Sequence, residues 1–374
     1  MNRIEIIEHG IVSRRMGSKF PYHGWPTVAR IQDDVLAAAG SAFRMAHTCP
    51  FGKVAMFTSG DEGKTWSPPA VLVDTLLDDR DAGLCRLDDG SILLNWFDAD
   101  LKARRDDWIN WFNIADLELR KARIREAGED YYQIATAYLD AVAGNTGSQI
   151  PCGSYLKKST DCGHTWTEPV SVPITSPHGP IQLSDGNVLY VGKNYSDREG
   201  DVSGIFAYQS TDGGLSWKYL STVPMCAEIN SKHPCEPHAV QMGNGKILCL
   251  IRIDQGFTIA QSISEDNGKS WSEAVSLGVN GSPPHVIQHS SGTLICAYGR
   301  RQPPFGQRVM LSNDCGKTWL QDLVLRDDGF SWDLGYPSSV ELKDGSILTV
   351  YYQALNKGEP PSFLYTKWKL CDMV

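Results

Sequence analysis

An eight-residue motif that recurs five times constrains the fold of this chain more than any other feature. The motif reads Ser-x-Asp-x-Gly-x-Thr/Ser-Trp, and its copies begin at Ser59, Ser159, Ser210, Ser264 and Ser312. Each copy is expected to be a turn that satisfies its own polar groups. The aspartate accepts backbone N–H bonds, the glycine supplies an unusual dihedral angle and the tryptophan packs under the hairpin. Five fixed positions do not recur five times by chance, so the chain is built from repeats.

A second pattern, a short hairpin, alternates with the motif and occurs six times. Each copy is an apolar strand, a turn and a second apolar strand, and such turns are strong hairpin signals. Five turns contain a glycine, namely Gly90, Gly186, Gly245, Gly292 and Gly345, and a degenerate first copy has Asp33-Asp34. Units that repeat around a ring are typical of propellers. The sequence therefore predicts an all-β fold, a six-bladed β-propeller.

The spacing of the motifs locates one insertion. The five motif aspartates are 100, 51, 54 and 48 residues apart in chain order. The long first interval predicts a small helical insertion in the second blade at residues 101–147, with helices over 117–124 and 131–142. The last strand, 362–368, is expected to pair with residues 4–7 and close the ring, which removes exposed edges. The prediction is one propeller domain over residues 1–374.

Composition excludes several classes of partner. The chain of 374 residues has a formal net charge of −9 and no run of Lys or Arg, which argues against nucleic acid as a partner. It has no run of 18 apolar residues, so no membrane span is expected. Its 10 cysteines are scattered, and the N-terminus does not resemble a signal peptide, which favours reduced thiols and a cytoplasmic location. No cofactor is indicated, and no HExxH-type spacing indicates a metal. The sequence assigns no oligomeric state.

Because the blades are repeats, one position can be compared across all six of them. Counting nine residues back from each hairpin glycine, or from Asp34, reaches the start of the inner strand, which faces the central funnel of a propeller. The six residues are Trp25, Asp81, Pro177, Glu236, Pro283 and Tyr336. Carboxylates do not normally share a buried register with proline and tryptophan unless something uses them. We therefore expect Asp81, Glu236 and Tyr336 to gather at one functional site near the axis of the ring.

Other polar residues are predicted to face the same funnel. His238 and His285 follow two residues further along their inner strands, and Arg252 and Arg300 come near the ends of the second strands. His47 is expected to line the funnel as well, while Trp108 and Trp111 of the insertion could act as a lid. The predicted substrate-binding residues are Trp25, Arg44, Arg80, His178, His238, Arg252, His285 and Arg300.

The repeated motif resembles the Asp-box, or BNR repeat, of the sialidase superfamily, and this resemblance covers nearly the whole chain. The segment from Glu236 to Arg252 looks like the sialidase segment with the catalytic glutamate and the second carboxylate-binding arginine. Residues 335–339, which include Tyr336, resemble the segment with the tyrosine nucleophile. The resemblance implies that a glutamate helps this tyrosine attack a crowded anomeric carbon. The third arginine of the family would be Arg300 or Arg308.

The chain departs from the sialidase pattern at the first arginine. The opening Arg-Ile-Pro of the family corresponds here to Gly24-Trp25-Pro26. The glutamate that braces this arginine would fall at Tyr352 or Gln353, and neither residue is acidic. The first-blade loop at residues 44–53 also lacks the acid/base aspartate of the family. Losing an arginine together with its partner indicates a rebuilt pocket, so a sugar other than sialic acid is expected.

The leading functional hypothesis is an exo-acting glycoside hydrolase of the sialidase superfamily with altered sugar specificity, acting on an oligosaccharide or glycoside. Asp81 would be the general acid, because neighbouring carboxylates raise its pKa, and Glu236 with Tyr336 would be the nucleophile or base pair. Two alternatives stay open. One is a polysaccharide lyase acting on a uronate-containing glycan through His238, Tyr336 and Arg252. The other is a non-catalytic glycan-binding propeller.

Overall fold

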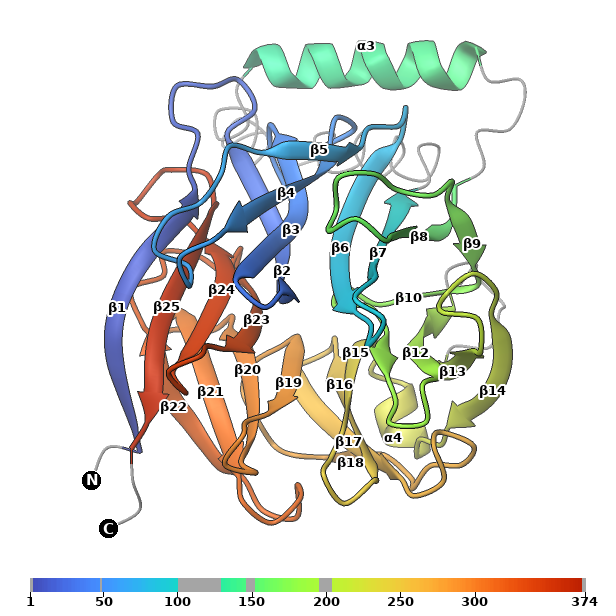
Figure 1. Ribbon diagram of the computed structural model, residues 1–374. Coiled ribbons are helices and arrows are strands. Elements are labelled where there is room, and N and C mark those ends of the chain that lie inside the picture. Colours follow the sequence, from blue (N-terminus) through green and yellow to red (C-terminus); the bar gives the residue numbers. More distant parts are fainter. Residues whose placement is uncertain (1–2, 48, 100–128, 146–151, 195–203, 372–374) are drawn as a thin grey trace.

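Each hairpin repeat in the sequence becomes one blade of the protein (Figure 1). The computed structural model describes residues 3–47, 49–99, 129–145, 152–194 and 204–371. These residues form six antiparallel sheets of four or five strands. The all-β, six-bladed propeller predicted from the repeats is therefore confirmed.

The strands follow the chain around the ring, from the inner to the outer strand of each blade. The first blade is β2 (Tyr22–Gln32), β3 (Val35–Arg44), β4 (Lys53–Ser59) and β5 (Ala70–Val73), and the second is β6 (Asp78–Arg86), β7 (Ile92–Ala99), β8 (Ser154–Ser159) and β9 (Val170–Val172). The third is β10 (Ile174–Thr175), β11 (Ile181–Gln182), β12 (Val188–Asn194), β13 (Ile205–Ser210) and β14 (Lys218–Val223). The fourth is β15 (Pro234–Gln241), β16 (Ile247–Ile253), β17 (Thr258–Ser264) and β18 (Val275–Ser276), and the fifth is β19 (Pro284–Gln288), β20 (Leu294–Arg300), β21 (Gly306–Ser312) and β22 (Leu320–Arg326). The sixth is β23 (Gly335–Glu341), β24 (Ile347–Gln353), β25 (Ser362–Leu370) and β1 (Ile4–Ser13).

The two ends of the chain close the ring, as the sequence predicts. Strand β1 pairs antiparallel with β25, from Ile4 opposite Leu370 to Ser13 opposite Phe363. The N-terminal strand is thus the outermost strand of the blade that the C-terminal segment builds (Figure 1). This arrangement covers the backbone edge that β25 would otherwise expose.

The aspartate of the recurrent motif accepts the same two bonds at every copy. In the first copy, Asp61 accepts bonds from the backbone N–H of Thr65 (2.9 Å) and from its hydroxyl (2.6 Å). The indole N–H of Trp66 donates to the carbonyl of Gly63 at 3.1 Å. The two bonds from Thr65 hold the carboxylate in its charged form and lower the pKa of Asp61 to about 2.

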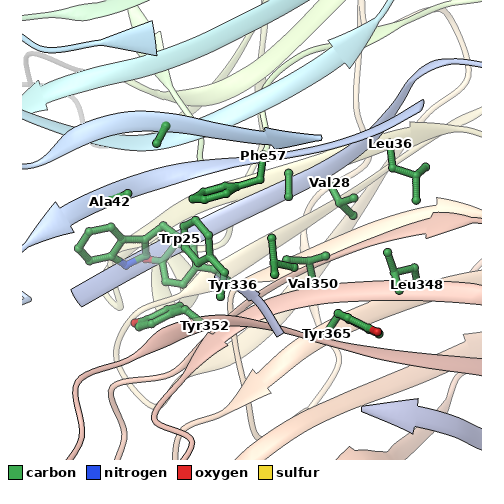
Figure 2. Packing of buried hydrophobic residues seen from close by; sticks show 14 of the residues in the cluster. Trp25, Val28, Leu36, Ala42, Phe57, Tyr336, Leu348, Val350, Tyr352 and Tyr365 are labelled. Carbon is green, nitrogen blue, oxygen red and sulfur yellow. The ribbon is translucent and has the colours of Figure 1, made fainter. Parts of the chain in front are cut away.

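The core is divided among the interfaces between neighbouring blades. One cluster joins the sixth blade to the first and includes Val28, Leu36, Phe57, Leu348 and Val350 (Figure 2). Similar clusters join the other blades. The apolar faces of adjacent sheets therefore bury one another, which leaves the inner ends of β2, β6, β15 and β23 available for polar residues.

The insertion lies between β7 and β8, in the second blade. Its described part is helix α3 (Glu129–Asn145), which confirms the helix predicted over 131–142. Tyr138 attaches it to the first blade, because its hydroxyl donates to the Leu76 carbonyl (2.9 Å) and its ring lies 4.9 Å from that of Phe51. The helix predicted over 117–124, Trp108 and Trp111 lie outside the described residues. A second helix, α4 (Ala227–Asn230), is a single turn.

All ten cysteines are free thiols. Within the described residues, no helix is both long enough and apolar enough to cross a bilayer.

Candidate functional site

Four inner strands carry the same unusual backbone feature at the residue that the repeat comparison selects. Trp25, Asp81, Glu236 and Tyr336 have φ values of 57°, 50°, 46° and 47°. At each of them the pairing register shifts, so each is part of a β-bulge. A left-handed conformation is costly for residues other than glycine, and such strain concentrates at functional sites. The bulges re-aim these four side chains at one end of the ring.

Glu236, Tyr336 and Arg252 form a closed hydrogen-bonded triangle. The Tyr336 hydroxyl donates to Oε1 of Glu236 at 2.5 Å. Nη1 of Arg252 donates to Oε2 of Glu236 at 2.6 Å and to the Tyr336 oxygen at 3.0 Å. Arg252 is also bound by Asp254 at 2.5 Å. Two neighbouring strands of the fourth blade, β15 and β16, therefore meet the inner strand of the sixth blade, β23, at one point, as the sequence predicts.

Burial and the charge of Glu236 keep Tyr336 protonated. Burial, followed by the charge of Glu236, raises the pKa of Tyr336 well above its ordinary value, while Arg252 opposes that rise. The phenol proton already points at a carboxylate oxygen. If the Tyr336 oxygen bonds to a ligand, Glu236 is therefore already in place to accept this proton.

Asp81 lies close enough to this triangle to interact with it electrostatically. Burial, and to a smaller extent the charge of Glu236, raises the pKa of Asp81 to about 7, although Arg80 opposes the rise. Asp81 is only 7% exposed, and its Oδ1 has no hydrogen-bond partner among the described residues. A buried carboxyl group that is left without a partner is available for a ligand.

Trp25 is held between two arginines. The guanidinium carbons of Arg80 and Arg44 lie 4.0 and 4.7 Å from the centroid of its ring. Arg44 is fully buried and pairs with both oxygens of Asp78, at 2.5 and 3.0 Å. Arg44 therefore helps to hold the Trp25 ring in position.

Trp25 also contacts Tyr352, the residue at the position where the sialidase pattern has a bracing glutamate. Their ring centroids are 5.9 Å apart, and Trp25 lies 6.3 Å from the ring of Tyr336 (Figure 2). The predicted loss of an arginine and its carboxylate partner therefore corresponds to a pair of packed aromatic rings. Two buried aromatic rings therefore stand where the family pattern has an ion pair.

The structure separates Arg300, a predicted substrate-binding residue, from the triangle. Its Nη1 donates to both carboxylate oxygens of Asp322, in the outermost strand β22, at 2.9 and 3.0 Å. Arg308 is buried and donates to the carbonyls of Gln307 (3.0 Å) and Arg326 (2.6 Å). Neither arginine has a bond to the triangle among the described residues.

Arg301, the residue that follows Arg300, contacts Tyr336 of the triangle instead. The guanidinium carbon of Arg301 lies 5.3 Å from the ring centroid of Tyr336, and Nη2 lies 3.3 Å from the Tyr352 hydroxyl. Side chains alternate across a strand, so a slip of one residue moves a side chain to the opposite face. The count from the hairpin glycine ends at Arg300, the last residue of β20, and so does not reach Arg301. The only sequence signal for Arg301 is its position next to Arg300.

The three predicted histidines come together, but around one another. The rings of His238 and His285 stack at 4.3 Å, and His178 meets His285 edge-on at 4.8 Å. His238 accepts from the backbone N–H of Val286 (3.1 Å) and His285 from that of Ser339 (3.2 Å). Burial lowers the pKa of all three, that of His238 to about 4. The contacts of these neutral rings fasten inner strands to one another.

His47 follows β3 and lies beside Trp25, with 5.1 Å between ring centroids. Its Nδ1 is 2.9 Å from Asp333, which also accepts from the hydroxyls of Tyr22 (2.9 Å) and Tyr352 (3.0 Å). Asp333 precedes β23 in a loop that joins two blades, so the comparison of repeats could not find it.

No group of His, Cys, Asp and Glu within the described residues could hold a metal ion.

Comparison with known proteins identifies the repeat. The family of BNR repeat-like domains matches residues 137–349. A sialidase of Bacteroides fragilis (strain YCH46) is 25% identical over 227 residues, which are 53% of this chain and 39% of that protein. The chain thus spans well under half the length of this curated relative.

Solved structures share the fold at low sequence identity. A protein of unknown function from Dyadobacter fermentans DSM 18053 aligns with a TM-score of 0.78 at 20% identity, over 99% of this chain and 100% of that one. A leech intramolecular trans-sialidase aligns with a TM-score of 0.62 at 15% identity, over 96% of this chain and 70% of that one. These likenesses concern the fold alone.

Proposed function

The chain belongs to the family of BNR repeat-like domains, and we propose that it is an exo-acting glycoside hydrolase that releases a sugar other than sialic acid. The observation that carries this proposal is the 2.5 Å hydrogen bond from the Tyr336 hydroxyl to Glu236. It pairs a nucleophile with a base, which is the arrangement that activates a weak nucleophile. The curated relative that is named a sialidase supports the same class of reaction.

In the proposed reaction, Tyr336 attacks the anomeric carbon while its proton passes to Glu236. Arg252, which donates to both residues, stabilises the negative charge on either of them. Asp81, with its pKa raised to about 7, is partly protonated at neutral pH, and its protonated form can donate a proton or a hydrogen bond to the sugar. The strained bulges hold these groups before the substrate arrives, so little reorganisation is needed.

The proposed change of sugar rests on the aromatic pair Trp25 and Tyr352. Recognition of a sialic acid carboxylate requires arginines with free planar donors. The two rings pack on each other where the family pattern has an arginine and a glutamate, and Arg252 is occupied by Glu236 and Asp254. The proposed site therefore lacks the first of the family's carboxylate-binding arginines, and the second is already paired, which favours a sugar without a carboxylate.

A screen of aryl glycosides, with an aryl sialoside as control, tests the function. We expect release of the aryl group from at least one neutral glycoside at a kcat/KM at least about tenfold above that for the sialoside. Glu236→Gln should lower kcat on the order of 10³-fold, since its base and charge are lost. The control Glu265→Gln removes an exposed carboxylate that pairs with Lys246 and should retain full activity. Turnover that survives in Glu236→Gln would contradict the proposal.

Two alternatives make different products. The lyase hypothesis uses His238 as a base, but this ring is stacked on His285 and hydrogen-bonded to Val286, which favours hydrolysis. A lyase would create an unsaturated sugar that absorbs in the near ultraviolet, and a binding module would create no product. A reducing-end assay beside an absorbance scan therefore separates all three. The cytoplasmic location predicted from the cysteines stays a prediction.

A further inference from the structure

A histidine–aspartate pair, His47 and Asp333, lies outside the triangle. Nδ1 of His47 lies 2.9 Å from Oδ1 of Asp333. Asp333 is fixed in turn, because the hydroxyls of Tyr22 and Tyr352 donate to it at 2.9–3.0 Å. A carboxylate that accepts from Nδ1–H leaves Nε2 as the titrating nitrogen of the imidazole. Among the described residues, no hydrogen bond involves Nε2 of His47.

Trp25 connects this pair to the triangle. The His47 ring packs edge-on against Trp25 at 5.1 Å, and Trp25 packs edge-on against Tyr336 at 6.3 Å. Arg44 and Arg80 both donate to the His47 carbonyl, at 2.9 and 3.4 Å, which fixes the loop after β3. The His47 side chain is 34% exposed, whereas Asp81 is 7% exposed.

The two acids therefore differ in what they can reach. Asp81 occupies the same bulge position as Glu236 and Tyr336, on the side of the site that would hold the sugar. His47 is the more exposed of the two, and a departing group leaves toward solvent, so His47 is the better placed to meet it. A group that protonates the glycosidic oxygen has to contact the leaving side of the scissile bond.

We propose that His47, oriented by Asp333, donates the proton to the leaving-group oxygen, and that Asp81 serves as a hydrogen-bond donor to the sugar. This assignment rests on the proposed glycoside hydrolase function. His47 would touch the reacting atoms, and Asp333 would act through His47 as a positioning residue.

The Tyr336 oxygen bonds to the anomeric carbon as its proton moves to Glu236, the C–O bond breaks with its electron pair on the leaving oxygen, and that oxygen takes the Nε2 proton of His47. Neutral His47 then takes a proton from water, whose oxygen bonds to the anomeric carbon. The Tyr336–carbon bond breaks, and the phenolate recovers its proton from Glu236. The net reaction consumes one water and no redox partner.

A series of leaving groups tests the proposal. The wild type, His47→Gln and Asp81→Asn are compared on dinitrophenyl, nitrophenyl and methyl glycosides of the sugar that the screen identifies. A leaving group that departs without a proton bypasses the acid. We expect His47→Gln to lose about 10²–10⁴-fold in kcat/KM on the methyl glycoside and less than about tenfold on the dinitrophenyl glycoside. Asp81→Asn should lose the same factor on all three. His164→Gln, at an exposed turn of the second blade, should change nothing.

A pH profile distinguishes orientation from mere structure. The charged or titratable groups that face His47 are Asp333, Tyr22, Arg44, Arg80 and Arg301. Burial lowers the pKa of His47, and Asp333 partly restores it. Asp333→Asn should therefore move the basic limb of kcat/KM for the methyl glycoside to lower pH, while its effect on the dinitrophenyl glycoside stays small.

Two results would overturn the assignment. A leaving-group dependence in Asp81→Asn that is absent in His47→Gln would make Asp81 the acid and leave the hydrolase function intact. A wild-type protein that hydrolyses none of the glycosides would remove the hydrolase function, and the role of His47 with it.

Discussion

At the scale of single residues, the phenol of Tyr336 holds the site together. Its oxygen accepts from Arg252, and its proton is committed to Glu236. In the proposed reaction this oxygen is also the nucleophile. One substitution can separate the proposed chemical role of the phenol from its structural role.

Tyr336→Phe should abolish turnover and leave the fold in place. The ring still packs against Trp25 and Tyr352, while the nucleophilic oxygen is gone. We expect kcat to fall on the order of 10³-fold or more, with an unfolding free energy within about 2 kcal/mol of the wild type. Stopped assays and urea unfolding measure the two. Retained kcat with an unchanged fold would remove Tyr336 from the chemistry.

Asp81 should make the protein less stable as the pH rises from about 4 to 7. Its pKa in the folded protein is raised to about 7, above the value of about 4 in an unfolded chain. Between these values the unfolded chain releases the proton first, so the unfolding free energy falls through this window and is constant above it. Asp81→Asn should flatten this part of the profile, whereas the exposed Asp88→Asn should not. Urea unfolding at pH 4 and pH 8 provides the comparison, and parallel wild-type and Asp81→Asn profiles would contradict the assignment.

At the scale of elements, the turn of the repeated motif also joins neighbouring blades. Gly63 has a φ of +83°, and an added Cβ would lie 2.8 Å from Cδ2 of Leu348, in the sixth blade. Gly90 has nearly the same φ, +82°, but an added Cβ would meet nothing within 4 Å. The pair separates the cost of the dihedral angle from the cost of the contact.

Gly63→Ala should therefore destabilise the protein more than Gly90→Ala does. The dihedral angle costs each variant about 1 kcal/mol, and overpacking against Leu348 adds about 1–3 kcal/mol to the first. Urea unfolding of the two variants measures the difference. Equal losses would mean that the motif turn is only a local structure.

What the sequence predicts at this scale is the repeated part of each element. Trp25, Asp81, Glu236 and Tyr336 share one position because the blades share one hairpin, so the comparison of repeats placed them together. It failed at β20, where Arg300 ends the strand and the next residue, on the other face, reaches Tyr336. It also could not place Asp333, because the loops between blades do not repeat.

At the scale of the whole molecule, ring closure brings the sixth blade to the first. Trp25 and Tyr22 of the first blade pack on Tyr336 and Tyr352 of the sixth. Strand β1 completes the sixth blade through its pairing with β25. The site therefore depends on the closure of the ring as well as on its own residues.

Removal of residues 1–13 should open the ring. The deletion exposes the edge of β25 and unpairs the outer strand of the blade that carries Tyr336, so lower stability and self-association are expected. Thermal unfolding and light scattering measure both. A truncated protein with an unchanged melting temperature and a monomeric scattering mass would show that β1 does not contribute to closure.

The central claim is that Tyr336, paired with Glu236, forms a covalent bond to the sugar. An activated fluorosugar of the hydrolysed glycoside should trap this intermediate, and mass spectrometry of the digested protein locates it. We predict that one sugar is added to the peptide that contains Tyr336, and that Tyr336→Phe is unlabelled. A sugar found on Asp81 or another residue, or steady turnover without any trapped adduct, would contradict the claim.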